Sequence, residues 1–115
     1  LLVTMTNLGR LYISQRRFDE ARAILAKALA TSRRVQPPGY YGTGFTLSAY
    51  GEALLELERF AEAEAALLEA HENLARAFEP DAPPLRRLVE TIVRLYERSG
   101  QLAKAERWRK ATPTD

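Results

Sequence analysis

The strongest constraint on the fold of this chain is an internal sequence repeat of period 42. Three short segments share a bulky apolar residue followed three positions later by an alanine, and these alanines are Ala21, Ala63 and Ala105. The same interval separates Gly9 from Gly51. A fixed period of this length is typical of proteins in which copies of one supersecondary unit stack side by side. The repeat therefore predicts a stacked array.

Each unit is predicted to be a pair of helices. In the first unit, apolar residues recur three or four positions apart, on one helical face; they are Leu2, Met5, Leu8, Leu11 and Tyr12. Gly9 lies beside this stripe. Because glycine in a helix costs about 1 kcal/mol relative to alanine, we expect it to admit a closely packed neighbouring helix. Similar stripes predict helices over about 2–14, 18–34, 45–57, 60–78, 85–96 and 102–110.

Proline and glycine mark the boundaries between units. Between the first two units we expect a loop, whose punctuating residues are Pro37, Pro38, Gly39, Gly42 and Gly44. Thr43 would cap the helix that follows. Asp81 would cap the third unit, with Pro83 and Pro84 in the first turn of its helix. The repeats are thus expected at about residues 2–36, 44–79 and 83–111 of a single domain spanning 1–115, with a frayed tail over 112–115.

The composition argues against several classes of function. The sequence contains no cysteine, so it forms no disulfide or thiolate metal site, and no apolar run approaches the roughly 20 residues that a membrane span needs. Its 17 basic residues are scattered among 15 acidic ones, whereas nucleic-acid binding usually requires a concentrated basic face. We therefore expect neither a membrane nor a nucleic acid as partner. The lack of cysteine favours the cytoplasm, and an opening within a helical pattern at Leu1 predicts a fragment of a larger protein.

The repeats resemble those of the tetratricopeptide family, in which a first helix carries a Leu-Gly pair and an aromatic residue, and a second helix carries alanines. The first copy matches at Leu8-Gly9, Tyr12, Phe18, Ala21, Leu25 and Ala28, and the second at Tyr50-Gly51, Leu54, Phe60, Ala63, Leu67 and Ala70. The third copy has Val93 where glycine is expected and Arg109 where an apolar residue is expected. The period exceeds the value of about 34 residues usual in the family and resembles that of the kinesin light chain-like repeats. The resemblance implies an all-α, right-handed solenoid of three helical hairpins.

The resemblance also implies a concave groove lined by the first helices of the three units. The residues that it places on this groove are Asn7, Arg10, Ser14, Phe45, Glu52, Glu56, Arg87, Thr91, Arg94 and Arg98. One interpretation is that the arginines, which share a helical face, hold an acidic peptide by forked hydrogen bonds. The other is that charges on neighbouring helices pair with each other as a ladder, which we favour for most of them. Arg87 has no acidic equivalent beside it and is the best candidate for a cation that binds a ligand.

The sequence shows no pattern typical of catalysis, of a metal site or of a cofactor site. His71 is the only histidine, and it lacks the second histidine four positions on that a zinc helix needs, so we interpret it as a solvated helix residue. Tyr40 and Tyr41 are expected in an exposed loop, where they could form an association surface. Trp108 would either fold back on its own helix or remain an exposed anchor for self-association.

We therefore predict a non-catalytic module without cofactor or metal that binds a protein or peptide, with an acidic segment as one candidate ligand. A homodimer through the ends of the array is the other association considered. The alternative function is a regulatory or dimerisation segment of a larger enzyme, such as a bacterial Ser/Thr kinase or regulator. The bacterial assignment rests on 14 arginines against 3 lysines, together with 18 alanines, which suggest a GC-rich source.

Overall fold

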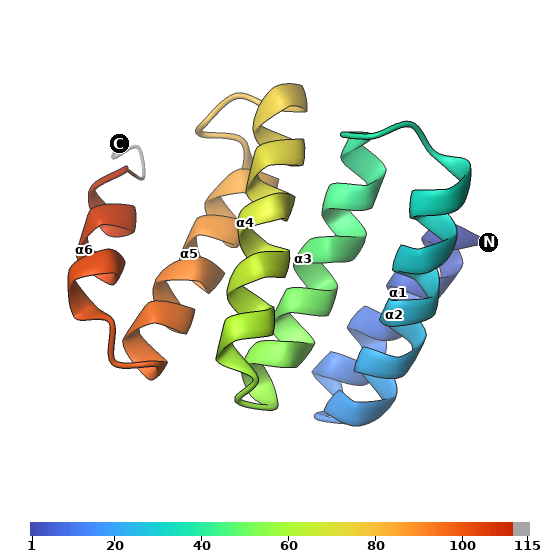
Figure 1. Cartoon of the computed structure of the whole chain (residues 1–115), viewed down its shortest axis with the longest axis horizontal. Helices are drawn as coiled ribbons and strands as arrows, with labels where there is room; N and C mark the ends of the chain where they lie inside the picture. The colour runs from blue at the N-terminus through green and yellow to red at the C-terminus, as the bar shows by residue number, and fades with distance from the viewer. Residues whose placement is uncertain (112–115) are drawn as a thin grey trace.

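The computed structural model describes residues 1–111, and within them the chain forms six α-helices and no strand. The helices are α1 (Leu2–Ser14), α2 (Phe18–Val35), α3 (Tyr41–Glu56), α4 (Phe60–Ala77), α5 (Pro83–Arg98) and α6 (Leu102–Ala111). They form three antiparallel hairpins that follow one another along the long axis, from α1 and α2 at one end to α6 at the other (Figure 1). The predicted all-α solenoid of three hairpins is confirmed. The tail predicted over 112–115 lies outside the described residues.

The same turn closes all three hairpins. One residue in each turn has a left-handed backbone, and the three φ angles are 62° at Arg16, 61° at Glu58 and 77° at Gly100. The next residue's amide donates to a carbonyl five positions earlier; these bonds are Arg17 to Tyr12 at 2.8 Å, Arg59 to Leu54 at 2.9 Å and Gln101 to Tyr96 at 2.8 Å. This is the Schellman arrangement, which satisfies carbonyl groups that a helix end would otherwise leave without a partner.

Glycine allows close approach of the two helices in the first and second hairpins, as the sequence predicts. A Cβ atom at Gly9 would lie 2.4 Å from the Cγ atom of Leu25, and one at Gly51 would lie 2.6 Å from the Cγ atom of Leu67. Carbon atoms do not approach this closely without bonding, since their preferred separation is about 3.5–4.0 Å. Any larger residue would therefore push the leucine and its helix away.

The third hairpin has different residues at the same two positions. Val93 replaces the glycine, and Arg109 stands where the facing leucine would be. Arg109 is exposed and pairs at the surface with Glu97 and, at 2.7 Å, with Glu106. The departure of the third copy from the pattern of the first two is therefore a paired change, because no leucine has to fit against the added valine side chain.

The apolar core runs along the array as two clusters. The larger cluster joins α3, α4, α5 and α6 and includes the fully buried Leu54, Leu67 and Ile92. The smaller cluster joins the first hairpin to α3, with Leu25 and Ala53 at its centre. The core thus lies within and between successive hairpins, as expected when each unit buries its apolar face against its neighbour.

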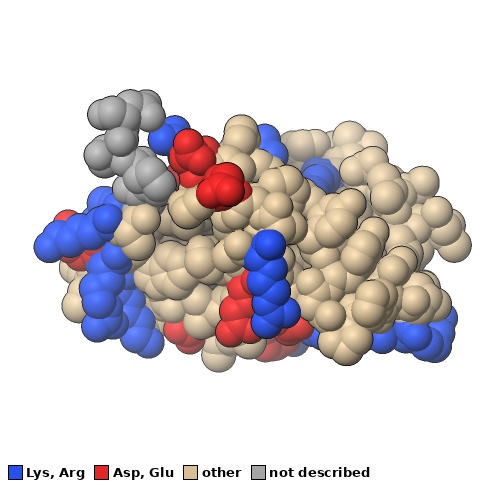
Figure 2. Space-filling view, turned by 90° about the horizontal axis from the view of Figure 1, so that it is seen from above, with Lys and Arg blue, Asp and Glu red and all other residues tan. Residues whose placement is uncertain are grey.

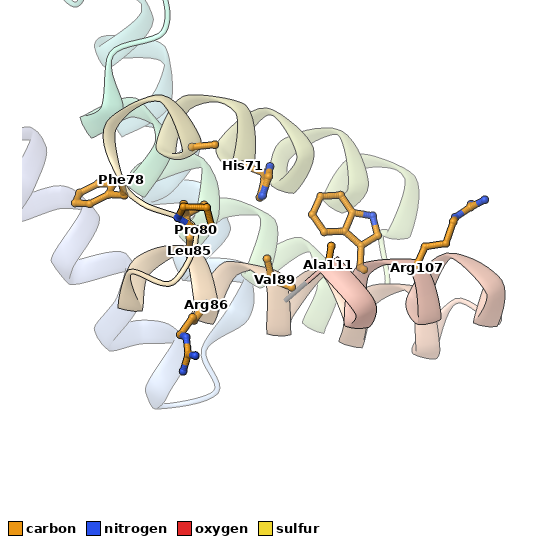
Figure 3. Close-up of a pocket in the computed structure, with 10 residues that line it drawn as sticks. His71, Phe78, Pro80, Leu85, Arg86, Val89, Arg107 and Ala111 are labelled. Atoms are coloured by element: carbon orange, nitrogen blue, oxygen red, sulfur yellow. The ribbon is translucent and has the colours of Figure 1, made fainter. Parts of the chain in front are cut away.

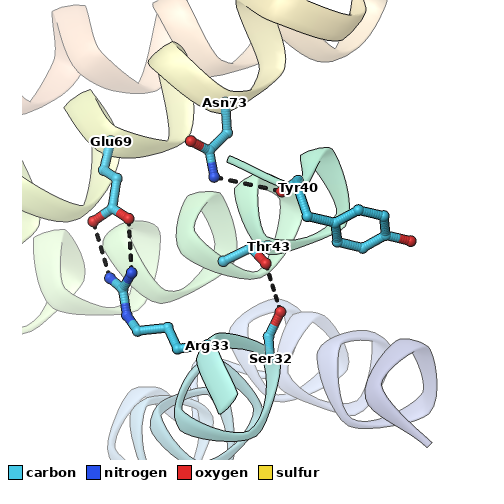
Figure 4. A network of polar contacts seen from close by, with 6 residues as sticks. All are labelled: Ser32, Arg33, Tyr40, Thr43, Glu69 and Asn73. Atoms are coloured by element: carbon cyan, nitrogen blue, oxygen red, sulfur yellow. Dashed lines mark hydrogen bonds and ion pairs between the residues drawn. The ribbon is translucent and has the colours of Figure 1, made fainter. Parts of the chain in front are cut away.

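Polar contacts connect the first hairpin to the second (Figure 4). Arg33 on α2 donates two hydrogen bonds to Glu69 on α4, at 2.8 and 2.9 Å. Nearby, the hydroxyl oxygens of Ser32 and Thr43 lie 2.5 Å apart, and both side chains are buried. The hydroxyl pair satisfies polar groups that would be costly to bury alone. We call the Arg33–Glu69 pair the clasp of the first junction.

Helix α3 begins one turn earlier than predicted. The sequence predicts a loop through Gly44, whereas the helix already starts at Tyr41. Thr43 does not cap the helix, because its side chain is buried against α2. Gly44 is inside the helix, where an added Cβ atom would lie 3.0 Å from the Cβ atom of Asn73 on α4. This glycine therefore permits close helix packing rather than a flexible loop, and a prediction from loop composition was wrong.

Helix α5 also starts without the cap that was predicted. Ala82 occupies the cap position, and no side chain accepts a capping hydrogen bond there, so the assignment of Asp81 as cap was wrong. Pro83 and Pro84 lie in the first turn as expected. Proline fits this position because its missing amide hydrogen would have no partner within the helix.

Candidate binding groove

The first helices of the three hairpins, α1, α3 and α5, contact one another in sequence and carry the predicted groove residues. Helix α1 meets α3 through the buried hydroxyl groups of Thr6 and Thr46, whose oxygens lie 2.9 Å apart. Helix α1 also contacts α3 through Arg10, whose Nη2 atom donates a hydrogen bond to the carbonyl oxygen of Phe45 at 3.2 Å. The second of these contacts holds the Arg10 side chain against α3.

Helices α3 and α5 are connected by a ladder of ion pairs. Arg98 pairs with Glu56 at 3.0 Å, and Arg94 pairs with Glu52 at 3.8 Å. Both pairs are partly exposed, so each contributes about 0–1 kcal/mol to stability. The ladder that the alternating charges predict is therefore present between α3 and α5, and both acidic side chains of α3 take part in it.

Positive charge is in excess where α1 and the N-terminal part of α5 flank α3. Burial lowers the pKa of Arg10; the carboxylate of Glu52 opposes this shift, and the positive charge of Arg87 adds to it. Arg87 forms no ion pair with any residue between 1 and 111, and Glu52 is shared with Arg94. Arg10 and Arg87 therefore repel each other across α3, and the carboxylates that line the same pocket are those of Glu52 and Glu90.

A pocket of about 230 Å³ lies between these groups. Six of the predicted groove residues line it, namely Arg10, Phe45, Glu52, Arg87, Thr91 and Arg94. Glu56 and Arg98 lie one helical turn further along the ladder. Ser14 lies at the end of α1 and donates its hydroxyl hydrogen to the carbonyl of Leu11 at 2.6 Å, so the structure does not bring it to this pocket.

Asn7 lines a second pocket of about 310 Å³, which Arg10 and Phe45 share with the first. Tyr40 and Tyr41 line it too, although only Tyr41 is exposed. The rings of Tyr41 and Phe45 lie 6.3 Å apart, centre to centre. The two tyrosines thus extend the groove toward the N-terminal end of the array, where the sequence placed them in a loop.

Sequence reasoning missed four residues that line the 230 Å³ pocket. They are Ser48, Leu74, Pro84 and Glu90. Glu90 follows Arg87 by three positions, so the helical period of α5 could have revealed it. Leu74 belongs to α4, and no pattern confined to the first helices could have indicated it.

Trp108 lies outside the groove, in a pocket between the second and third hairpins. It neither folds back on α6 alone nor remains fully exposed. It is half-buried, with its ring in edge-to-face contact with His71 on α4 at 4.9 Å between centres. His71 is also half-buried, and burial lowers its pKa, so the interpretation as a solvated residue was wrong.

Residues 1–111 offer no sign of two other kinds of site. No group of three or more potential metal ligands lies together in this part of the chain. None of the helices described combines the length and the apolar character that crossing a membrane requires.

Comparison with solved structures identifies the architecture. Two crystal structures of a putative kinesin light chain from Podosopora anserina, with nearly identical TPR-like repeats, match this chain with TM-scores of 0.83 and 0.84. Each is 17% identical in sequence and is aligned over 96% of this chain. The chain spans about half the length of these structures, 52% of one and 53% of the other. This likeness establishes the fold.

A search of curated proteins finds no match to this chain. The family model described as tetratricopeptide repeat matches residues 1–76, which is more than half of the sequence. Repeats of this kind are generally non-catalytic scaffolds for protein–protein interaction. On the match of these residues and on the fold of its three hairpins, the chain belongs to the tetratricopeptide repeat family.

Proposed function

We propose that the groove of this chain binds a protein or peptide segment that presents an acidic side chain. The observation that carries the proposal is that Arg10 on α1 and Arg87 on α5 line one pocket over α3, where the positive charge of Arg87 contributes to lowering the pKa of Arg10. A carboxylate placed between two guanidinium groups would remove this repulsion and accept a hydrogen bond from each.

The ladder on α3 and α5 supports the same assignment. Glu52 and Glu56 are the acidic residues of α3 that face α5, and both already pair with arginines of α5. Among the described residues that line the pocket, Glu90 is then the carboxylate left to compete with an acidic ligand for Arg87. Arg10 is exposed as a whole residue, but partial desolvation of its guanidinium group lowers its pKa and strengthens its interaction with an opposite charge.

Binding of acidic peptides to variants of the chain tests this proposal. Two fluorescent peptide pools, identical except that glutamate in one is replaced by glutamine in the other, are titrated with the protein and followed by anisotropy. We expect the glutamate pool to bind more tightly, and Arg87→Glu to weaken that binding by about tenfold or more, as for loss of a charge-assisted hydrogen bond.

Arg34→Glu is the matched control. Arg34 is exposed in the last turn of α2, outside the groove, and the substitution changes the net charge by the same amount. Equal loss of binding in Arg34→Glu and Arg87→Glu would indicate a general charge effect and contradict the groove. Equal binding of the two pools would contradict the proposal that the ligand must present an acidic side chain. Failure of both pools to bind would favour the alternative function, a regulatory segment of a larger enzyme.

A further inference from the structure

The face of the first hairpin that points away from the second hairpin has the features of an association surface. Helices α1 and α2 form this end of the array (Figure 1). Repeat equivalence identifies residues of this face, which we call the end face. Glu69 points from α4 toward the first hairpin, where it pairs with Arg33 in the clasp. Its counterpart one repeat earlier is Lys27 on α2, which therefore points away from the second hairpin.

The clasp does not recur at the second junction, where α4 meets α5 and α6. The counterparts of Arg33 and Glu69 one repeat later are Ala75 and Ala111. The position of Glu69 thus carries a lysine, a glutamate and an alanine in the three repeats. Of the two repeats at the ends of the array, only the first therefore has a charge at this position.

The end face also presents large apolar side chains at positions that the second repeat buries. Ala53 is fully buried in a cluster that includes Leu25 of the first hairpin. Its counterpart one repeat earlier is Leu11, which is 51% exposed. Three further counterparts of buried residues are only half-buried in the first repeat, namely Met5, Tyr12 and Ile24. These are apolar groups of the kind that a neighbouring hairpin covers elsewhere in the array.

A hollow of about 410 Å³ on the end face brings apolar and charged groups together. Its lining residues are Met5, Tyr12, Glu20, Ala23, Ile24 and Lys27. Glu20 and Lys27 are seven residues apart, which is close to two helical turns, so they lie on one side of α2 at about 10 Å from each other along its axis. Ala23 and Ile24 are midway between them. The apolar centre is therefore flanked by one negative and one positive charge.

This arrangement is self-complementary. A two-fold axis between Ala23 and Ile24 would set α2 of one copy antiparallel to α2 of a second copy, with each Lys27 opposite the Glu20 of the other. Lys27 forms no ion pair with any residue between 1 and 111 and is exposed. Glu20 pairs with Arg17 at the surface, and its carboxylate has further lone pairs to accept a second donor. Two ion pairs would thus form on either side of one apolar contact.

The opposite end of the array is less suited to self-association. Helix α6 contains four basic residues and one acidic residue, so two α6 helices would repel each other. Figure 2 shows basic side chains gathered at this end of the molecule. The largest apolar side chain of α6, Trp108, lines a pocket of about 510 Å³ between the second and third hairpins, where its ring contacts His71 (Figure 3). This indole ring therefore packs within the chain.

We propose that two copies of this chain associate through the end faces of their first hairpins, with the two α2 helices antiparallel about a two-fold axis. The apolar groups around Ile24 form the centre of the interface and supply most of its affinity. The pairs between Lys27 and Glu20 fix the register of the two helices. The hollow shares no lining residue with either pocket of the groove, so this association does not depend on the function proposed for the groove.

Sedimentation equilibrium of the chain tests the association directly. Over a concentration series from about 1 μM to about 1 mM, the range of weak affinities, we expect the mass to rise from 13.0 kDa toward twice that value. A chain that stays monomeric throughout the series overturns the proposal. Species larger than a dimer also overturn it, because head-to-tail stacking continues into open chains whereas a two-fold contact closes at two copies.

Exchange of the two charges is the decisive experiment. Lys27→Glu sets two carboxylates against each other in both pairs of the dimer, and Glu20→Lys does the same with two ammonium groups. Each variant alone should raise the dissociation constant by about tenfold or more, as expected for like charges in contact. An equimolar mixture of the two variants should restore association, because every glutamate then faces a lysine. Local damage to either variant cannot produce this rescue, and a mixture that associates no better than its components contradicts the two-fold arrangement.

Matched controls lie at the other end of the array. Lys110→Glu makes the same change of charge at an exposed position of α6 and should leave the dimer intact. Leu11→Asn should weaken the dimer by about fivefold through loss of apolar contact. Leu102→Asn, at a leucine of α6 that is 66% exposed, should have no effect. Equal weakening by Leu11→Asn and Leu102→Asn, or by Lys27→Glu and Lys110→Glu, overturns the assignment of the end face.

Circular dichroism of each variant checks that the helices remain intact. Arg87→Glu should leave the dimer unchanged, and Lys27→Glu should leave the binding of acidic peptides unchanged. Failure of the groove proposal and failure of this one can therefore be told apart.

Discussion

Arg16 and Glu58 have the same left-handed backbone conformation, with φ angles of 62° and 61°, at equivalent turns of the first two repeats. The third copy of the turn places Gly100 at this position, with φ of 77°. A left-handed conformation costs about 1–2 kcal/mol for residues that carry a Cβ atom. The first two turns are therefore strained in a way that the third is not.

Glu58→Gly should raise the free energy of unfolding by roughly 0.5 kcal/mol, because the relief of strain exceeds the added entropy of the unfolded chain. Glu58 suits this test better than Arg16, whose guanidinium lies over the ring of Phe18. Gly100→Ala should lower the free energy of unfolding by about 1 kcal/mol. A Cβ atom at this position would meet none of the described residues within 4 Å, so the cost is purely conformational. Urea unfolding measures both, and destabilisation by Glu58→Gly would contradict the account.

Gly51→Ala should destabilise the chain by about 1–3 kcal/mol, the usual cost of overpacking a core. The added methyl group would lie 2.6 Å from the side chain of Leu67. Combining it with Leu67→Ala should cost less than the sum of the two single changes, because the truncated side chain leaves room for the methyl group. Thermal unfolding of the four proteins in this cycle gives the coupling, and strict additivity would mean that the clash is absent.

The phenol of Tyr96 should ionise at an unusually high pH. Burial raises its pKa from 10.0 to about 12, and a hydrogen bond of 2.7 Å to the carboxylate of Glu64 adds to the shift. Because the folded state favours the protonated phenol, this contribution to stability is complete below pH 10.0 and is lost as the pH rises toward 12. Ultraviolet titration should show one late phenol that disappears in Tyr96→Phe; a late phenol that persists in this variant would contradict the assignment.

The fluorescence of Trp108 should depend on pH through His71. Burial lowers the pKa of His71 below its ordinary value of 6.5, and Glu72 partly opposes this shift. The folded state therefore favours the neutral imidazole, so its stabilising contribution is complete above pH 6.5 and is lost as the pH falls. Because the two rings are in contact, protonation should quench the indole with a midpoint below 6.5. His71→Gln serves as the control and should abolish this transition, whereas a midpoint above 6.5 would contradict the burial.

The repeat period predicted most of the fold. Apolar stripes placed the starts of the helices at Leu2, Phe18, Phe60 and Leu102, where the structure has them. The period also identified Gly9 and Gly51 as points of close helix approach, because the same unusual residue recurred in the same helical context.

The start of α3 could not be predicted in the same way. Local rules interpret a segment that contains Gly42, Thr43 and Gly44 as a loop, whereas its helical conformation depends on contacts with Ser32 of α2 and Asn73 of α4. Those partners belong to other helices, one earlier in the chain and one later. Propensity was overridden by packing that becomes apparent only when the hairpins are assembled.

Six residues that line the 230 Å³ pocket could be placed together from the sequence, but the electrostatics of the pocket could not. Helical spacing placed Arg87 and Arg94 on one face, and repeat equivalence set Glu52 beside Arg94. The contact of Arg10 with the carbonyl of Phe45 depends on the conformation of a long side chain, which the sequence does not specify. The lack of a clasp at the second junction could also have been predicted, because alignment of the repeats places Ala75 and Ala111 at the positions of Arg33 and Glu69.

The helices at the two ends of the array bury far fewer side chains than those in the middle. Only Ala105 is buried on α6, and only Thr6 and Gly9 on α1. In an array of this kind, order is lost locally before the whole chain unfolds, so the end hairpins should open first and the central hairpin last. A ligand held by both Arg10 and Arg87 would tie the first hairpin to the third. Occupancy of the groove would then suppress fraying at both ends at once, and partner binding would be thermodynamically linked to the cooperativity of the array.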